Sequence, residues 1–465
     1  MSASTQAIVL AAGKSSRFNT SLTKLSYKIC GREMIRYPLN LLAELNFDTT
    51  VVVGHQQEIL RKIIADNEYK VTCVEQAMQK GTGHALLCTR SQWISEQLLI
   101  LNGDTPLITK EHIETLLEKH RVSGATISFM TSFNEDSTII GYGRVIKKAT
   151  GLSIVEHRDF TGDPKKDCIL NAGIYLIERA FLEQQLPSLA THASGEIFIT
   201  DLIEKASHLG HHVEMVDIPF EYVRGINTLK ELSTAEKFVT SQIISRWMEK
   251  GVRFLAPESV LIDHDVIIGP NSTIGYGVQL SEGTHVGTGV TIEGFSRIVR
   301  SVIHDLSSVY SHSVISDSIL HTGVRIGPFA HVHRNSICHE KSIIGNFVEL
   351  SKSSVGAHSK AKHLTYLGQA HIGRSVNIGA GTITCNYDGV NKNETCIKDN
   401  AFVGSNCSLI APLTIGSDAI IGAGSTVTED VPDGALAIAR QRQVNKEHYS
   451  VKIRAAKASK IVQAT

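Results

Sequence analysis

A short glycine-containing segment near the N-terminus has the composition of a phosphate-binding turn. The apolar residues 7–10 lead into Ala11-Ala12-Gly13-Lys14-Ser15-Ser16-Arg17, for which we predict a strand, a turn and then a helix. Backbone N–H groups of such a turn can surround a phosphate chain. Lys14, Arg17 and, further on, Lys24 add positive charge. The glycine pattern alone fits an ordinary strand-to-helix turn with surface charges equally well.

A single carboxylate makes the phosphate interpretation stronger. Asp104 follows the apolar residues 98–101, which read as a buried strand that ends at Asn102-Gly103. Ligands of open α/β sheets bind at the carboxyl ends of the strands. A carboxylate at that edge is suited to hold Mg²⁺ against phosphate oxygens. The alternative is a helix cap that precedes Pro106.

A third candidate is a histidine in the second half of the chain. His363 opens a stretch, residues 363–389, that contains an unusual density of polar side chains. Imidazole is the natural general base near neutral pH. The chain has 21 histidines, so without further context a surface or hydrogen-bonded role for His363 is the better interpretation than a catalytic one.

The first half of the chain alternates between two kinds of segment. Residues 50–53, like 7–10 and 98–101, form short apolar runs, whereas residues 34–45 and 83–89 have helical spacing. This alternation predicts an α/β domain with a mostly parallel sheet covered by helices.

The second half follows a period of six. Aliphatic residues stand six apart at Ile262, Ile268, Ile274, Leu280, Val286, Ile292 and Ile298, and again at Val403, Leu409, Ile415, Ile421 and Val427. The phase slips between these runs, although the spacing recurs. Such hexads predict a parallel β-helix in which each apolar residue points inward and glycine permits the corners. A helix over residues 228–250 would connect the halves, giving domains 1–227 and 251–440 and a basic tail, 441–465.

Composition excludes several classes of protein. The net charge is zero, with 46 basic and 46 acidic residues, which argues against a general nucleic-acid binder. We find no apolar run of about 18 residues and no secretory signal, so no membrane association is expected. The eight cysteines form no C-x-x-C pair, and we expect reduced thiols in a cytoplasmic protein.

The motifs also carry a resemblance. LAAGKSSRF, Lys24, EQAMQKGTGHA, NGD, GYGRV, IVEH and NAGIY stand in the order found in sugar-phosphate nucleotidyltransferases. With the hexads, residues 6–449 resemble the bacterial bifunctional family of N-acetylglucosamine-1-phosphate uridyltransferase/glucosamine-1-phosphate acetyltransferase. The resemblance implies a Rossmann-like nucleotidyltransferase domain followed by a left-handed β-helix of hexapeptide repeats. It also implies synthesis of UDP-N-acetylglucosamine from small-molecule substrates by a homotrimer, with Mg²⁺ as cofactor and acetyl-CoA and UTP as co-substrates.

The resemblance assigns roles in the first half. Mg²⁺ would be held by Asp104 and Asn227, while Lys24 and Arg17 would neutralise charge during uridyl transfer. The nucleotide and the sugar would contact Leu10, Ala11, Ala12, Gly13, Lys24, Gln76, Gly81, Thr82, Asn102, Gly103, Asp104, Gly143, Glu156, Asn171 and Asn227.

In the second half, the resemblance makes His363 the base that deprotonates the amine of glucosamine 1-phosphate. Glu349 and Asn386 would orient the imidazole or the substrate. The sugar phosphate would lie at His333, Ser351, Tyr366, Asn377 and Lys392. Acetyl-CoA would lie along Ala380, Asn386, Tyr387, Ser405, Ala423 and Arg440.

The chain departs from the family pattern at two places. Ser15-Ser16 replace the usual Gly-Thr, and His333 and Ser351 replace an Arg and a Lys that face the sugar phosphate. Losing two cations should weaken phosphate binding by about 1.5–3 kcal/mol for each charged hydrogen bond. The alternative is therefore a uridyltransferase whose β-helix serves trimerisation or acetylates another amino sugar. A non-enzymatic scaffold would leave Asp104 and GTGHA unexplained.

Overall fold

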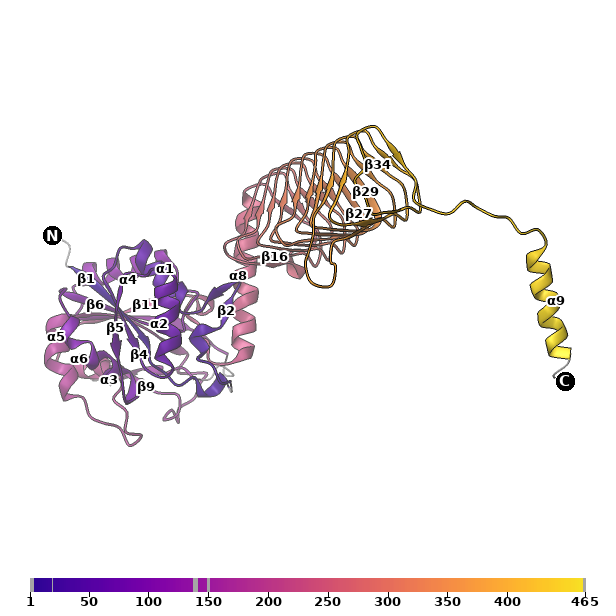
Figure 1. Ribbon diagram of the computed structural model, residues 1–465. Helices are drawn as coiled ribbons and strands as arrows, with labels where there is room; N and C mark the ends of the chain where they lie inside the picture. The colour runs from indigo at the N-terminus through magenta and orange to yellow at the C-terminus, as the bar shows by residue number, and fades with distance from the viewer. Residues whose placement is uncertain (1–3, 19, 137–140, 149–150, 463–465) are drawn as a thin grey trace. The chain divides into compact units, whose positions relative to one another are not determined.

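The computed structural model describes residues 4–18, 20–136, 141–148 and 151–462, and divides the chain into two compact units, residues 1–243 and 244–465. Helix α8, Leu229–Glu249, contains the point of division. Figure 1 shows a central sheet with surrounding helices in the first unit and a stack of short strands in the second. No helix of the described ranges is long and apolar enough to cross a membrane.

The first unit is built on a mostly parallel sheet. Its order is β11-β7-β10-β6-β1-β4-β5, in which β10 alone runs antiparallel to its neighbours β6 and β7. The strands are β1 (Thr5–Ala11), β4 (Thr49–Val53), β5 (Val71–Glu75), β6 (Gln97–Asn102), β7 (Ile127–Phe133), β10 (Ile169–Glu178) and β11 (Val213–Asp217). The antiparallel pair β8 (Arg144–Lys148) and β9 (Gly151–Val155) is joined to β10, and β2 (Lys28–Ile29) pairs with β3 (Arg32–Glu33).

Helices cover this sheet, as Figure 1 shows. They are α1 (Arg36–Glu44), α2 (Gln57–Asp66), α3 (Gly81–Cys88), α4 (Lys110–Ser123), α5 (Arg179–Gln185), α6 (Asp201–His208) and α7 (Phe220–Val223). The central strands are buried on both faces, which is why residues 98–101 of β6 are all apolar. The alternation in the sequence thus predicted the fold class correctly.

The predicted helix after the glycine turn is wrong. Only a single 3₁₀ turn, Ser16–Phe18, follows Gly13, and the chain reaches a first α-helix at Arg36. A second 3₁₀ turn, Lys24–Ser26, lies in between. No macrodipole of a long helix therefore points at this turn, and positive charge there must come from side chains.

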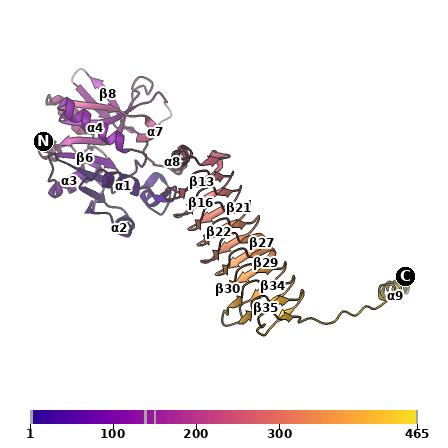
Figure 2. The ribbon, with the colours of Figure 1, turned by 90° about the horizontal axis from the view of Figure 1, so that it is seen from above.

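The second unit is the predicted stack of parallel coils, consistent with a left-handed β-helix. Strands of two or three residues for the most part run from β12 (Arg253–Phe254) to β39 (Leu436–Ala437), and Figure 2 shows them as successive layers. Each hexad residue lies over its equivalent in the next coil, and the aliphatic columns are buried. The coil continues past Val427, where the hexads stop, because β39 still pairs with β37 (Ile420–Ile421).

The register explains the phase slips. Ile262 pairs with Leu280, three full hexads further along the chain, whereas Val286 pairs with Ile303, which falls one position short of three hexads. A shorter corner keeps the buried column intact but breaks the period of six in the sequence. Later, the coil that joins Ile372 to its partner Ile397 is longer, because residues 386–394 form a loop outside the regular coil.

The tail beyond the β-helix contains a helix, α9 (Tyr449–Val462), which the sequence did not indicate. The side chains described there, up to residue 458, are exposed. The eight cysteines all lie in the described ranges, and none of them forms a disulfide.

The contact between two long strands depends on one glycine. Gly345 lies in β27 (Ile343–Ser351), and a Cβ atom there would lie 1.9 Å from the carbonyl oxygen of Lys362 in β29 (Lys360–Gly368). We expect Gly345→Ala to lower the free energy of unfolding of the β-helix by about 1–3 kcal/mol, since the strands must separate. Urea unfolding measures this loss.

The control is Gly422→Ala in the same β-helix. Its Cβ would lie nearest the side chain of Ile438, at 3.1 Å, which can move, and at an ordinary contact distance of 3.5 Å from the Ala437 carbonyl oxygen. An equal loss in both variants would contradict the close-approach explanation.

Candidate active sites

The first unit contains a cavity of about 560 Å³ at the carboxyl ends of β1 and β6. Nearly every residue that the resemblance assigns to the nucleotide and sugar lines it. These are Leu10, Ala11, Ala12, Gly13, Lys24, Gln76, Gly81, Thr82, Asn102, Asp104, Gly143, Glu156, Asn171 and Asn227, and Arg17, assigned to charge neutralisation, lines it too. Gly103 does not line the cavity. Its N–H donates to the carbonyl of Leu10 at 2.9 Å, and a Cβ there would meet the Ile35 side chain, so this glycine allows close packing at the end of β1.

A cation–carboxylate cluster stands at the floor of this cavity. The Lys24 ammonium donates to Asp104 and, at 2.8 Å, to Oδ1 of Asn227. Arg17 donates to the same Oδ1 at 3.1 Å. The N–H of Ile226 donates to the Asp104 carbonyl at 3.0 Å, which ties the end of the domain to the strand end. Side-chain oxygens of Asp104 and Asn227, which are distant in sequence, thus converge on the ammonium group of Lys24.

The glycine turn contains an unusual backbone conformation. Ser15 has φ +55°, in the left-handed region, and its Oγ accepts a hydrogen bond from the N–H of Lys24 at 3.1 Å. A residue with a side chain is strained there by about 1–2 kcal/mol. This explains why glycine is the residue that the family pattern shows at this position, and how serine replaces it. The hydrogen bond offsets part of the strain and fixes the start of the Lys24 turn.

Gln76, which the resemblance assigns to the uracil base, lines the cavity and is buried. Its Nε2 lies 3.1 Å from the Gly81 carbonyl oxygen and 2.9 Å from Nδ1 of His84. Burial, with the charge of Lys80, lowers the pKa of His84, so that a neutral ring accepts this hydrogen bond. The orientation of the Gln76 amide is therefore fixed, as hydrogen-bonding to a base edge requires.

The cavity is also lined by the residues assigned to the sugar. Asn171 donates from its side chain to the Tyr175 hydroxyl at 2.7 Å and from its N–H to the Gly143 carbonyl at 2.9 Å. Thr200 donates to Glu156 at 2.9 Å, and burial raises the pKa of that carboxyl. Thr200 was not predicted from the sequence, because it lies beyond NAGIY, the last of the quoted motifs of the first unit.

Tyr142 is a second residue that the analysis missed, although it stands inside the quoted motif GYGRV. Its hydroxyl accepts a hydrogen bond from the N–H of Gly225 at 2.8 Å, and both residues line the cavity. This bond fixes the segment that precedes Asn227 at the wall of the cavity.

In the second unit His363 lies beside an asparagine that the sequence analysis did not identify. Asn346 of β27 and His363 of β29 are direct neighbours in the strand register, and Oδ1 of Asn346 lies 2.8 Å from Nδ1 of His363. An amide oxygen can only accept, so Nδ1 carries the proton and Nε2 keeps its lone pair. This is the tautomer that a general base needs. Glu349 and Asn386, the predicted orienting residues, bond elsewhere within this chain.

The predicted sugar-phosphate residues fall into separate groups. His333 of β25 (His331–His333) pairs in register with Ser351, and Glu349 pairs with Tyr366, so these four lie together. Asn377 instead pairs with Lys360, at the other end of β29. It lines a hollow of about 400 Å³ with Arg325, Lys341 and Lys360. One chain therefore does not gather the whole set.

The residues assigned to acetyl-CoA form a column along one corner. Asn406, next to Ser405, donates its N–H to the Ala380 carbonyl at 2.8 Å, and Gly424, next to Ala423, donates to the Ser405 carbonyl at 2.8 Å. A Cβ on Gly424 would lie 3.7 Å from the Arg440 side chain, which places Arg440 one coil further along. The column consists of small side chains that end at a cation.

The loop 386–394 carries the remaining assigned residues. Asn386 is buried and donates to Gln369 at 3.0 Å. Tyr387 and Lys392 form an antiparallel bridge that closes the loop.

Comparison with known proteins defines the class. Residues 7–189 match the model of the MobA-like NTP transferase domain, residues 256–366 that of the GMPPB C-terminal domain, and residues 397–429 six repeats of the bacterial transferase hexapeptide. A nucleotidyltransferase domain is thus joined to a hexapeptide-repeat transferase domain.

Whole-chain relatives give the family. The chain is 40% identical to the bifunctional protein GlmU of Pelobacter propionicus over 96% of this chain and 98% of that protein. It is 38% identical to the GlmU protein of Shouchella clausii and 40% identical to that of a Synechococcus species, over 95% of this chain and 98% of each relative. The chain belongs to the bifunctional GlmU family and is a bifunctional transferase, as its motifs implied.

The strain at Ser15 leads to a prediction about stability. We expect Ser15→Ala to lower the free energy of unfolding of the first unit by about 1 kcal/mol, because it removes the hydrogen bond and keeps the strain. Ser15→Gly removes both, so it should be nearly neutral. Urea midpoints of the two variants test this, and equal losses would contradict the left-handed assignment.

Proposed function

We propose that the chain makes UDP-N-acetylglucosamine in two reactions. The second unit transfers an acetyl group from acetyl-CoA to glucosamine 1-phosphate, and the first joins the product to UTP with release of pyrophosphate. The observation that carries the proposal is the pair of independent sites: the cavity around Asp104 in one unit and the oriented His363 in the other. Family membership supports the same pairing of activities.

In uridyl transfer, an oxygen of the sugar phosphate attacks the α-phosphorus of UTP, and the bond to the departing pyrophosphate breaks. The two substrates would lie end to end in the cavity, with Gln76 at the uracil base and Glu156 at the sugar; both residues line it. Lys24 and Arg17 both donate to Asn227 Oδ1, so they lie together and would neutralise charge on the phosphates. Positioning and charge neutralisation are the main needs of such a reaction.

The residues present fit a magnesium ion. The oxygens of Asp104 and Asn227 converge on one point, at which the Lys24 ammonium stands in for a cation. Carboxylate and amide oxygens, together with phosphate oxygens of the substrate, are the ligands that Mg²⁺ prefers. When bound, the ion would neutralise phosphate charge; Lys24 would then move to the phosphates.

In acetyl transfer, the amine nitrogen of the sugar attacks the thioester carbonyl, and the CoA thiolate leaves. Nε2 of His363 accepts the amine proton, because Asn346 holds the proton on Nδ1. The small residues of the Ala380–Ser405–Ala423 column leave room for the pantetheine arm, and Arg440 would pair with a CoA phosphate.

We also propose that the chain assembles as a trimer whose copies complete the acetyl-transfer site. Within one chain, Asn377 and Tyr366 lie at opposite ends of β29 and its neighbours. One corner of the β-helix carries a ladder of half-exposed aromatic rings, Tyr276, Phe295, His312, Phe329 and Phe347. An apolar ridge of this kind suits contact with another copy. Cytoplasmic location stays a prediction of the sequence.

Asp104→Ala should remove uridyl transfer and leave acetyl transfer unchanged. The variant loses one of the two converging oxygens and the anion that places Lys24. Pyrophosphate release from UTP and N-acetylglucosamine 1-phosphate measures the loss, and release of CoA thiol is the internal control. Near-normal uridyl transfer would contradict the assignment of Asp104.

Asn346→Ala should give the reverse result. Without the amide oxygen, the His363 ring is free to place its proton on Nε2 and to rotate. We expect kcat of acetyl transfer to fall about 10²-fold or more, as for loss of general-base assistance, with uridyl transfer intact. Asn346→Asp keeps an acceptor and should recover much of the rate. If both variants behave like the parent, Asn346 does not orient the base.

A further inference from the structure

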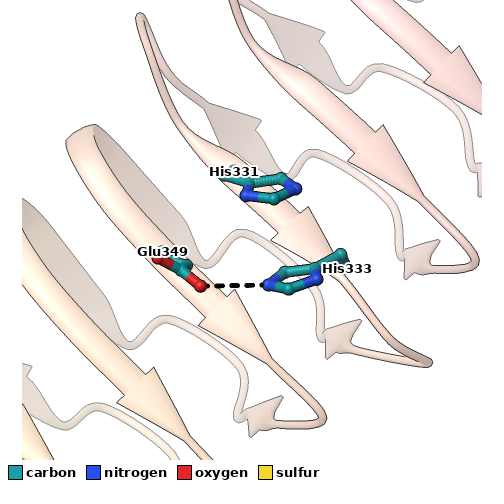
Figure 3. A group of neighbouring side chains, drawn as sticks. All are labelled: His331, His333 and Glu349. Carbon is teal, nitrogen blue, oxygen red and sulfur yellow. Dashed lines mark hydrogen bonds and ion pairs between the residues drawn. The ribbon is translucent and has the colours of Figure 1, made fainter.

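Two histidines and a glutamate form a compact group on the outer surface of the β-helix. His331 and His333 are two residues apart in β25, so both point away from the core, and Val332 between them is buried. Glu349 lies in β27, one coil further along, opposite His331 in the register. Figure 3 shows the three side chains turned toward one another.

The geometry brings three metal-binding groups together. Nε2 of His333 lies 3.2 Å from a carboxylate oxygen of Glu349, and the two imidazole rings stack with centroids 4.1 Å apart. One ligand atom from each residue lies within 4.8 Å of the other two. Zinc–ligand distances of about 2.0–2.2 Å require these atoms to approach further. His331 is exposed, so its ring can rotate to do this.

The ligand types suit a metal better than an ion pair alone. Neutral imidazoles with one carboxylate are donors for Zn²⁺ and related divalent ions, and three protein ligands leave a position open for a substrate oxygen. A pair between His333 and Glu349 would by itself give no role to His331.

The position of the group matters for the acetyl-transfer site. His333 pairs in register with Ser351, and Glu349 with Tyr366. The family resemblance assigns His333, Ser351 and Tyr366 to the sugar phosphate, and the first two of them lack the usual cations. A carboxylate beside a phosphate is repulsive unless a positive charge stands between them. A divalent ion held by one carboxylate leaves a net charge of about +1 at the site, the sign that a phosphate needs.

We propose that His331, His333 and Glu349 bind a divalent transition-metal ion of the zinc class, whose open position takes a phosphate oxygen of the amino-sugar 1-phosphate. The ion replaces the two cationic side chains that this chain lacks. The metal site stands on its own geometry, whereas its phosphate role rests on the proposed acetyl transfer. Glu349 is available because His363 is held by Asn346 instead.

Zinc binding is tested on the full chain after chelation and desalting, by titration against a chromophoric competitor. We expect one tightly bound Zn²⁺ per chain. His331→Gln keeps the His333–Glu349 contact but should weaken binding about tenfold or more. His304→Gln is the matched control, because His304 is an exposed histidine that stacks on His321 in another column. If His331→Gln binds zinc like the parent, the site is overturned.

The phosphate role is tested by kinetics of the same samples. Stripping the metal should raise the KM for glucosamine 1-phosphate about tenfold, with a smaller effect on kcat, and Zn²⁺ should restore it. The double variant His333→Arg/Ser351→Lys should keep a low KM whether or not zinc is present. An unchanged KM after stripping would overturn the phosphate role. If no form transfers acetyl groups while zinc still binds, the proposed acetyl transfer fails and the metal site stands.

Discussion

Parallel pairing of strands at a fixed register is the constraint on which both units depend. In a parallel sheet the carboxyl ends of neighbouring strands meet at one edge, so Leu10 of β1 and Asn102 of β6 are direct partners at the cavity. In the β-helix the same pairing places side chains of successive coils directly above one another. Asn346 meets His363, and His331 meets Glu349, for this reason alone. Chemistry in both units is built from residues that are distant in sequence but adjacent in register.

The sequence predicted the large features well, because each depends on a repeated pattern. Hydrophobic runs that alternate with helical spacing define the first unit, and the hexads define the second. The helix predicted after Gly13 is absent, because the sequence signals for a helix are weak there. Ser15 instead adopts a left-handed conformation, and two 3₁₀ turns lead the chain to Lys24 and beyond. Gly103 of the NGD motif packs closely against the Ile35 side chain and the Leu10 carbonyl, a contact that the motif alone does not reveal.

Cross-coil contacts were the part of the site that the sequence could not supply. The pairing of Asn346 with His363 depends on a coil that falls one position short of the three full hexads that the regular repeat implies. Only the structure shows at which corners a residue has been lost. His331 and Glu349, by contrast, stand three full hexads apart, so the period of six could have placed one over the other. This group was missed because only His333 had been recognised as an unusual residue. A substitution that looks like a loss in a linear comparison can be part of a new arrangement between coils.

The variable coil lengths have a consequence for how such a protein can change. Regular coils, shortened coils and the long coil that carries residues 386–394 stack here without disturbing the buried columns, since every difference is taken up at a corner. A corner therefore tolerates insertions and deletions. A segment such as residues 386–394 can be lengthened, shortened or exchanged while the buried columns keep their packing. New substrate preferences can thus be acquired one loop at a time, with little effect on the stability of the scaffold.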